Sequence, residues 1–277
     1  MITAGSKYLN GAWWYNALNS RFRDAVAGIA FSPHVETLSV NDIAFQFYVA
    51  TSQAKNWYAH GDMQSHEMRA VLDLVEPHGA TVFECGGHHG RDCVVLAYMI
   101  GEQGRIVTFE PHPDNARIIE RNVELNDLTN VTVVNAAVGS ATGELHIRDR
   151  SNAKVSLSGG GIRVPVETLD DWSSANLLYP DFIKIDVEGY EFEVLRGAAN
   201  IIRDRSPAVL VELHCDLARE FGNVPDDIWG FFDSQRYFVH LQQDDSVPAR
   251  IAGFGDSLSG RPHLYFVPRN AAHLRAE

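Results

Sequence analysis

The sequence predicts an α/β fold with a mostly parallel sheet covered by helices, and three observations lead to this prediction. Short apolar, β-rich runs alternate with helical patterns from residue 79 onward, as expected of parallel strands joined by crossover helices. The first run, 81–85, leads into a turn with Gly86, Gly87 and Gly90. The second run ends at Glu110, twenty positions after Gly90. Such a turn and an acidic strand end indicate a pocket for a nucleotide-like cofactor.

Length and composition set the outer limits. The chain has 277 residues, of which 45% are hydrophobic, enough to bury a full α/β core. We expect an N-terminal extension at 1–78 and a main domain at 79–277. No apolar run approaches the roughly 20 residues that span a bilayer, and the N-terminus lacks the order of a signal peptide. We therefore expect a cytoplasmic protein without a membrane partner.

Charge and cysteine content exclude further classes. The net charge of −13 disfavours a sequence-independent nucleic-acid binder, because such proteins displace phosphate counterions with lysine and arginine. The three cysteines, Cys85, Cys93 and Cys215, are too few and too scattered for a disulfide framework or a structural zinc site. We expect all three to be buried thiols.

The N-terminal extension is rich in aromatic side chains, among them Trp13, Trp14, Tyr15, Trp57 and Tyr58. We expect them to bury the extension against the main domain, since aromatics contribute large buried areas; a lid or a wall of the substrate pocket is the alternative. Residues 39–49 alternate in part and predict one added strand, and 65–75 predict a helix. Packing on a neighbouring subunit, which would give a homo-oligomer, stays open.

The main domain reads as strands and helices in alternation. The expected parallel strands fall near residues 81–85, 105–110, 131–135, 181–186 and 208–214. Residues 113–126 predict a crossover helix, with an apolar stripe on one face and Pro113 in its first turn. Two further strand-like runs, 236–241 and 263–268, are joined by a polar loop, which makes the last strand antiparallel. The result is a mostly parallel, seven-stranded sheet.

A long connection separates the third and fourth of these strands. It contains a predicted hairpin at 144–148 and the run Ser158-Gly-Gly-Gly161, which is typical of a mobile linker. Because the connection lies between core strands, a loop that orders over a bound ligand is the alternative hypothesis.

Six segments resemble a known family in order and spacing: Glu84-x-Gly86-x-x-x-Gly90, Phe109-Glu-Pro111, Asn135-Ala-Ala-Val-Gly139, Thr168-Leu-Asp-Asp171, Ile183-Lys-Ile-Asp-Val-Glu-Gly-Tyr-Glu191 and Val211-Glu-Leu-His214. Over roughly residues 65–214 the chain resembles the FkbM family of S-adenosylmethionine-dependent methyltransferases. The resemblance implies a Rossmann-like class I methyltransferase fold with an antiparallel seventh strand. It also implies methyl transfer to an oxygen of a small-molecule acceptor: a sugar, a polyketide or another natural product.

The resemblance also implies cofactor contacts. Gly86 and Gly90 would let the backbone pass under the methionine part of S-adenosylmethionine, and Glu84 would lie near its amino group. Glu110 would hold the ribose, and Asn135 and Ala137 would approach the adenine.

One departure falls in the glycine turn. Members of the family commonly carry Gly-Ala-Asn where this chain has Gly87-His-His89, so the contact made by that asparagine is in question. Adjacent side chains in a turn rarely converge on one metal ion, and we expect polar pocket or surface histidines here.

Strand alternation selects the catalytic candidates. The period of two places Glu212 and His214 on one face of the fifth strand, and Lys184 and Asp186 on one face of the fourth. We expect Lys184 and Glu212 to form an ion pair between the strands. His214 is the predicted general base, with Asp186 or Glu188 orienting it or the acceptor hydroxyl. A second version has Asp186, Glu212 and His214 hold a magnesium-type ion, since hard cations prefer oxygen ligands.

Two other functions compete with methyl transfer. A nicotinamide-dependent oxidoreductase shares the strand, the turn and the acidic residue, but its expected turn is Gly-x-Gly-x-x-Gly, which this chain lacks. A non-catalytic cofactor-binding protein is the other alternative, for which the altered turn is the hint. Methylation of nucleic-acid amines is disfavoured, because Asp186-Val-Glu-Gly189 replaces the expected Asn/Asp-Pro-Pro-aromatic motif.

Overall fold

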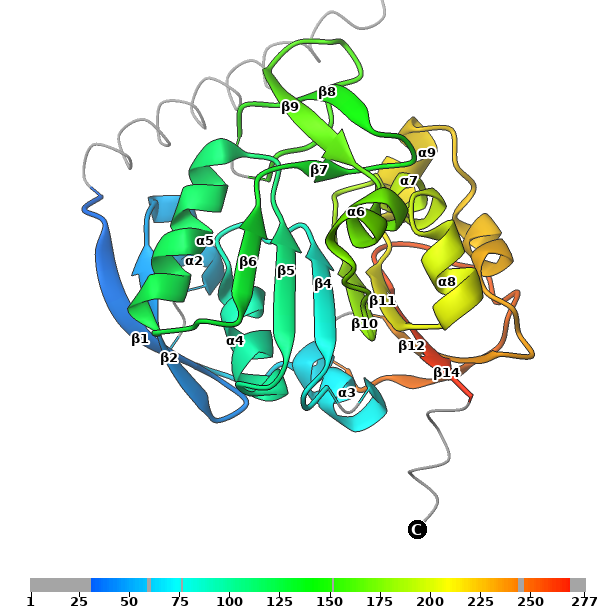
Figure 1. Cartoon of the computed structure of the whole chain (residues 1–277), viewed down its shortest axis with the longest axis horizontal. Helices are drawn as coiled ribbons and strands as arrows, with labels where there is room; N and C mark the ends of the chain where they lie inside the picture. The colour runs from blue at the N-terminus through cyan, green and yellow to red at the C-terminus, as the bar shows by residue number, and fades with distance from the viewer. Residues whose placement is uncertain (1–30, 59–60, 76, 151, 244–246, 270–277) are drawn as a thin grey trace, which may run out of the picture.

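An eight-stranded sheet forms the centre of the protein, in the order β13-β12-β14-β11-β10-β4-β5-β6 (Figure 1). The computed structural model describes residues 31–58, 61–75, 77–150, 152–243 and 247–269. Five strands pair in parallel: β6 (Val131–Val134), β5 (Arg105–Phe109), β4 (Thr81–Cys85), β10 (Phe182–Ile185) and β11 (Ala208–Glu212).

The other three strands complete one edge of this sheet. β14 (His263–Pro268) is antiparallel to β11 and to β12 (Tyr237–Gln242). The predicted α/β fold with an antiparallel last strand is therefore confirmed. A three-residue strand, β13 (Arg250–Ala252), pairs antiparallel with β12. It was not predicted, because so short a run carries no period of its own.

Side chains of the parallel strands divide between two hydrophobic clusters. Phe83, Ile183 and Ile185 belong to one cluster, whereas Val82 and Phe182 belong to the other. This split follows from the pleat, which sends successive side chains to opposite faces of a sheet. Both faces of the sheet are thus covered, as expected where helices connect parallel strands.

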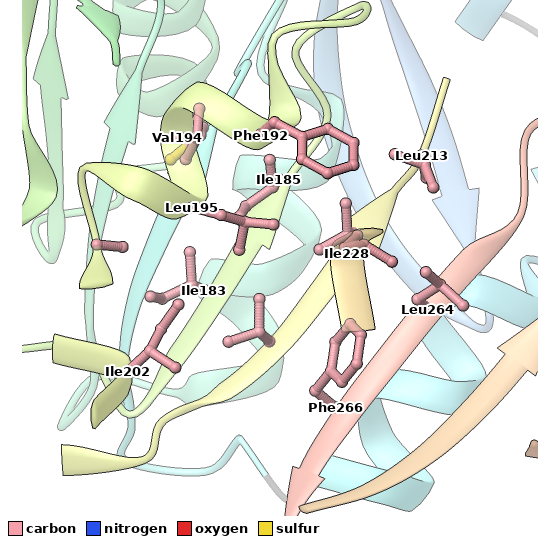
Figure 2. Packing of buried hydrophobic residues seen from close by; sticks show 14 of the residues in the cluster. Ile183, Ile185, Phe192, Val194, Leu195, Ile202, Leu213, Ile228, Leu264 and Phe266 are labelled. Carbon is pink, nitrogen blue, oxygen red and sulfur yellow. The ribbon is translucent and has the colours of Figure 1, made fainter. Parts of the chain in front are cut away.

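The first face is covered by the helices of the second half of the chain: α6 (Leu169–Asn176), α7 (Glu191–Arg196), α8 (Ala199–Arg205), α9 (Cys215–Glu220) and the 3₁₀ helix η1 (Pro225–Phe231). Figure 2 shows part of this packing, in which Phe192 and Leu195 of α7 belong to the same cluster as Ile185 of β10. The packing fixes α7 and α9, the two helices that follow the tips of β10 and β11.

The second face carries α3 (His66–Val75), α4 (Arg91–Ile100) and α5 (Pro113–Leu125). The helices predicted at 65–75 and 113–126 are confirmed within one residue at each end. Proline stands in the first turn of α5 as predicted, and the His112 ring accepts a hydrogen bond from the Asp114 N–H at 3.3 Å.

Residues 34–63 form a small sheet of β1 (His34–Val40), β2 (Ile43–Val49) and β3 (Asp62–Met63), with α2 (Ser52–Tyr58) between β2 and β3. The single strand predicted at 39–49 is wrong. Asn41 and Asp42 have positive φ angles of 47° and 69° and reverse the chain, as Asn and Asp do in two-residue hairpins.

This small sheet packs on the second face of the central sheet. The side chains of Phe45 and Phe47 are buried there, and the Tyr48 N–H donates to Asn122 of α5 at 2.6 Å. Trp13, Trp14 and Tyr15, which were expected to contribute to such packing, lie outside the described residues.

A third sheet interrupts the alternation between β6 and α6, formed by β7 (Ala137–Val138), β9 (Ile162–Glu167) and β8 (Gly143–Ile147). A hairpin is present in this connection, but the predicted bounds of 144–148 are wrong: Gly143–Ile147 form one strand, β8, which pairs antiparallel with β9. Figure 1 shows this sheet above the ends toward which β4, β5 and β6 point. The β8–β9 connection is therefore close to the carboxyl ends of the parallel strands.

The expectation of buried thiols is confirmed, since Cys85, Cys93 and Cys215 are all free and buried. None of the helices in the described ranges combines the length and the apolar character that a membrane span requires.

Candidate active site

The turn between β4 and α4 brings three strand ends together. Gly86 has φ +96°, and a Cβ there would lie 1.8 Å from the carbonyl oxygen of Asp186. The Gly86 N–H donates to the Phe109 carbonyl at 2.9 Å, and the Asp186 N–H donates to the Cys85 carbonyl at 3.0 Å. Only glycine permits this approach, which joins the tips of β4, β5 and β10.

A cavity of about 450 Å³ lies at these strand ends. Five of the residues predicted for the site line it: Gly86, Glu110, Ala137, Asp186 and Glu188. The walls come from parts of the chain that are far apart in sequence. Trp57 and Tyr58 belong to α2, Lys154 to the β8–β9 connection, and Arg261 to the segment before β14.

Glu110 is buried where β5 ends. One carboxylate oxygen accepts from the His88 N–H at 2.8 Å, and the other from the His112 N–H at 2.8 Å and from the Asn115 side chain at 3.3 Å. Burial raises the pKa of Glu110 to about 8, although these donors stabilise the charged form. The carboxylate is thus held in one position on the cavity wall.

The other residues predicted for the cofactor support this wall from behind. Glu84 is buried under the glycine turn, where its carboxylate accepts from Thr108 at 2.6 Å, and burial raises its pKa to about 7. Gly90, with φ +82°, packs against Ile119. The Asn135 side chain donates to the Glu110 carbonyl at 2.8 Å. None of these three is among the lining residues.

The histidine pair in the turn forms an aromatic cluster with α2. The His88 and His89 rings stack with centroids 4.2 Å apart, and His88 Nδ1 lies 2.5 Å from the Tyr58 hydroxyl oxygen. Burial lowers the pKa of His88 to about 2 and that of His89 to about 4. Both rings are therefore neutral at pH 7. His88 lines the cavity at the position of the departure from the family pattern.

The predicted catalytic residues come together behind the cavity. His214 follows β11 and is 3% exposed. Its Nε2 lies 3.7 Å from a carboxylate oxygen of Glu188 and 3.9 Å from one of Asp186. His214 is not itself among the lining residues; Asp186, Glu188 and Arg261 stand between it and the cavity.

Two functional residues were missed by sequence reasoning. Glu191 Oε1 lies 2.8 Å from His214 Nδ1, and an Arg261 nitrogen lies 2.8 Å from His214 Nε2. Glu191 ends the segment Ile185–Glu191 that carries the resemblance, so a signal for it was present. Arg261 belongs to no motif.

Electrostatics at this site favour protonation of both His214 and Asp186. Burial alone would lower the pKa of His214, but the hydrogen bond and charge of Glu191, with the charges of Asp186 and Glu212, raise it above 6.5. Burial and the neighbouring Glu212 raise the pKa of Asp186 to about 7. The Asp186 carboxyl therefore titrates near neutral pH, and the His214 ring is easier to protonate than a free imidazole.

Lys184 has other partners than the predicted Glu212. Its Nζ lies 3.2 Å from Asp92 and 3.5 Å from Glu67, whereas Glu212 pairs with Arg261 at 2.6 Å. The register explains the difference, because Lys184 stands opposite Leu210, two residues before Glu212. Those two residues correspond to about 6.6 Å along a strand.

The donor set of the predicted metal version does converge. One ligand atom each of Asp186, Glu212 and His214 lies within 4.8 Å of the others. Arg261, however, donates to Glu212 at 2.6 Å and contacts His214 Nε2. A guanidinium therefore supplies positive charge to two of the three groups.

The strand order, the glycine turn and the cavity at the carboxyl ends define a Rossmann-like class I methyltransferase fold. Residues 84–239 match the model of the methyltransferase FkbM domain, which covers more than half of the chain. The protein belongs to the FkbM methyltransferase family. The predicted resemblance is thus confirmed, and the family does not favour the nicotinamide alternative.

Individual relatives are distant. Methyltransferase 1 from Beauveria bassiana is 25% identical over 199 residues, which are 62% of this chain and 78% of that protein. The hexuronic acid methyltransferase AglP from Haloferax volcanii is 29% identical over 132 residues, 45% of this chain and 54% of that protein. The crystal structure of methyltransferase FkbM from Methylobacillus flagellatus has 19% identity and a TM-score of 0.46, over 68% of this chain and 43% of that one. This chain thus spans about half of the Haloferax protein and less than half of the Methylobacillus chain.

Proposed function

We propose that the protein transfers the methyl group of S-adenosylmethionine to a hydroxyl oxygen of a small molecule, with a saccharide as the favoured acceptor. One observation carries the proposal: His214 Nε2 lies within 4 Å of Asp186 and Glu188, which line the same cavity as Gly86 and Glu110. The predicted base therefore lies directly behind residues of the cavity that the cofactor candidates line.

The residues present fit the cofactor. Gly86 lines the cavity floor without a side chain. A larger residue does not fit here, because its Cβ would strike the Asp186 carbonyl. The fixed Glu110 carboxylate would accept hydrogen bonds from the ribose hydroxyls, and Ala137 would face the adenine without steric hindrance. S-adenosylmethionine, when bound, supplies a methyl group already activated by its sulfonium.

The protein's part of the reaction is orientation and proton removal. Orienting two reactants can lower a barrier by roughly 7–11 kcal/mol, and a placed base adds about 10²–10⁴-fold. His214 Nε2 would accept the proton of the acceptor hydroxyl, while bound S-adenosylmethionine would supply the activated methyl group. Asp186 and Glu188 accept hydrogen bonds from the acceptor and stabilise the protonated imidazole.

The choice of a saccharide is supported by the cavity walls. Trp57 is 40% exposed, and an exposed ring beside polar groups suits the C–H face and the hydroxyls of a sugar. A relative that is 29% identical over part of its length is a hexuronic acid methyltransferase.

We also propose that the segment before residue 79 acts as a substrate wall, because Trp57 and Tyr58 line the cavity. A nucleic-acid acceptor is disfavoured by the net charge of −13.

The metal version of the mechanism predicts a different outcome from the base version. If Asp186, Glu212 and His214 hold a magnesium-type ion, a chelator abolishes turnover and Mg²⁺ restores it. We expect turnover to be unchanged in EDTA, because Arg261 already donates to Glu212. Methyl-transfer assays with dialysed protein, with and without added Mg²⁺, decide between the two.

The first test is calorimetric titration of the purified chain with S-adenosylhomocysteine, and separately with NAD. We expect micromolar binding of S-adenosylhomocysteine alone. Binding of NAD alone would refute the proposal. Binding of neither would mean that the turn with His88 and His89 does not accept a cofactor, which leaves no basis for methyl transfer here.

A further inference from the structure

Glu191 lies behind the predicted base, in a position without access to solvent. It is the first residue of α7 and is 0% exposed. Its Oε1 accepts from the Gly189 N–H at 2.9 Å and lies 2.8 Å from His214 Nδ1. In the part of the chain that the structure describes, its Oε2 has no hydrogen-bond partner. A buried carboxylate is costly unless it is paired, so the imidazole is its main compensation.

Two independent contacts select the same tautomer of His214. The Glu191 carboxylate is an acceptor and requires a proton on Nδ1. The Arg261 guanidinium can only donate, so its nitrogen at 2.8 Å requires a lone pair on Nε2. The neutral ring therefore carries its proton on the side of Glu191, and its basic nitrogen faces Asp186, Glu188 and the cavity beyond.

The turn before α7 creates this arrangement. Glu188 and Gly189 have φ angles of +54° and +105°, and this sharp turn separates the two glutamates. Glu188 faces the cavity, where Lys154 holds its carboxylate at 2.9 Å, while Glu191 reaches the opposite side of the imidazole. The ring is thus held from behind by Glu191, while Arg261, Asp186 and Glu188 lie at its Nε2 on the cavity side.

We propose that Glu191 is the positioning residue of the general base, holding His214 in the tautomer whose Nε2 faces the cavity. This inference rests on the proposed function, in which His214 accepts the acceptor proton. A buried carboxylate in this position also stabilises the imidazolium that forms. Arg261 is 61% exposed, so its side chain can leave Nε2 when an acceptor hydroxyl arrives.

The groups that face the imidazole support proton transfer in this direction. Glu191 lies at Nδ1, while Asp186, Glu188 and Glu212 lie within 4 Å of Nε2, where the cationic Arg261 is also in contact. Once Arg261 has moved, a protonated Nε2 faces three carboxylates. The ring then both accepts the proton and holds it.

The test compares Glu191→Gln with Glu193→Gln in full-length protein saturated with S-adenosylhomocysteine. Glutamine keeps the size of the side chain but removes its charge, and Glu193 is a partly exposed residue of the same helix that pairs with Arg196. Nitrogen-15 NMR of the histidine rings reports the tautomer and the pKa of His214, assigned by the signal lost in His214→Ala. In Glu191→Gln we expect a smaller share of the Nδ1–H tautomer, because the charged acceptor at Nδ1 is gone and Arg261 alone then favours it. We also expect the acid dissociation constant of the His214 imidazolium to rise about tenfold. Glu193→Gln should match the wild type.

Turnover provides the second readout, with methyl glucuronoside as the probe acceptor. Glu191→Gln should lower kcat by roughly 10²–10⁴-fold, shift the acidic limb of the pH profile to lower pH, and leave the Kd of S-adenosylhomocysteine within about twofold. Glu191→Asp should recover part of kcat. In a His214→Ala background, Glu191→Gln should add little, because the two residues act as a unit.

The outcomes separate this inference from the proposed function. A Glu191→Gln variant with the wild-type tautomer, pH profile and kcat would overturn the positioning role, even if His214→Ala is inactive. If Glu191→Gln does not fold, Glu191→Ala is the second variant. Wild-type activity in Glu191→Ala would also overturn the positioning role of Glu191. Full activity of His214→Ala would instead refute His214 as the base, and the inference with it.

Discussion

At the scale of single residues, the site depends on charged groups held by backbone donors. Glu110 shows this most directly, because two N–H groups and the Asn115 amide fix its carboxylate at the cavity wall. Because the Glu110 carboxylate is held in one position, the ribose contact that we propose can form in few orientations. The same burial that fixes Glu110 makes its charge sensitive to pH.

We predict that S-adenosylhomocysteine binds more weakly as the pH falls through about 8. Burial raises the pKa of Glu110 to about 8, so the ionised form that accepts from both ribose hydroxyls dominates above that pH and is lost below it. Glu110→Gln should weaken binding by about 10–100-fold, the worth of a charged hydrogen bond, and should remove the pH dependence. Calorimetry between about pH 6 and 9 checks this; an equal pH dependence in the variant would exclude Glu110 as its source.

At the scale of elements, the turn from β4 to α4 joins the three strand tips that form the cavity floor. Gly86 makes this possible, since a Cβ at this position would lie 1.8 Å from the Asp186 carbonyl oxygen. The connection between β8 and β9 contains a second such position. A Cβ at Gly161 would lie 2.0 Å from the Ile147 carbonyl, so at least this glycine of the expected mobile linker is needed for a close backbone approach.

We predict that Gly86→Ala lowers the free energy of unfolding by about 3 kcal/mol or more, because it combines a positive φ with a backbone collision. It should also abolish binding of S-adenosylhomocysteine. Gly230→Ala is the matched control, because a Cβ there meets nothing within 4 Å, and its stability should stay near that of the wild type. Urea denaturation of both variants measures the difference; equal midpoints would show that the turn can move away from Asp186.

At the scale of the whole molecule, the cavity is assembled from segments inside and outside the family domain. Residues 84–239 supply the floor and the proposed catalytic residues. Trp57 and Tyr58 precede this range, and Arg261 follows it, yet all three line the cavity. Packing of the small β1–β3 sheet on α5, through contacts such as that of Tyr48 with Asn122, positions α2 at the cavity. Acceptor selection is therefore expected to depend on these flanking segments.

We predict that Trp57→Ala raises KM for methyl glucuronoside by about fivefold, because stacking of one ring contributes on the order of 1 kcal/mol. The Kd of S-adenosylhomocysteine should change less than about twofold, since Gly86 and Glu110 follow β4 and β5, whereas Trp57 belongs to α2. Trp57→Phe, which keeps an aromatic face, is the conservative control. A similar loss of S-adenosylhomocysteine affinity in Trp57→Ala would assign Trp57 to the cofactor instead.

Much of the fold could be predicted because its signals are local. Runs of β-rich residues, the glycine turn and the helix start at Pro113 depend on neighbouring residues. The hairpin at Asn41 and Asp42 was missed because alternation continues across its turn, and only the positive φ angles separate the two strands.

The sequence by itself determined the family, the sheet with its antiparallel last strand, and the strand ends where Glu110, Asp186, Glu188 and His214 gather. Only the tertiary structure decided which side chains meet. Lys184 faces Asp92 because of the strand register, and Glu191 reaches His214 because of the left-handed turn at Glu188 and Gly189. Periodicity reports the face of an element that a residue occupies. Contacts between elements depend on register, turn angles and packing, which no local pattern encodes.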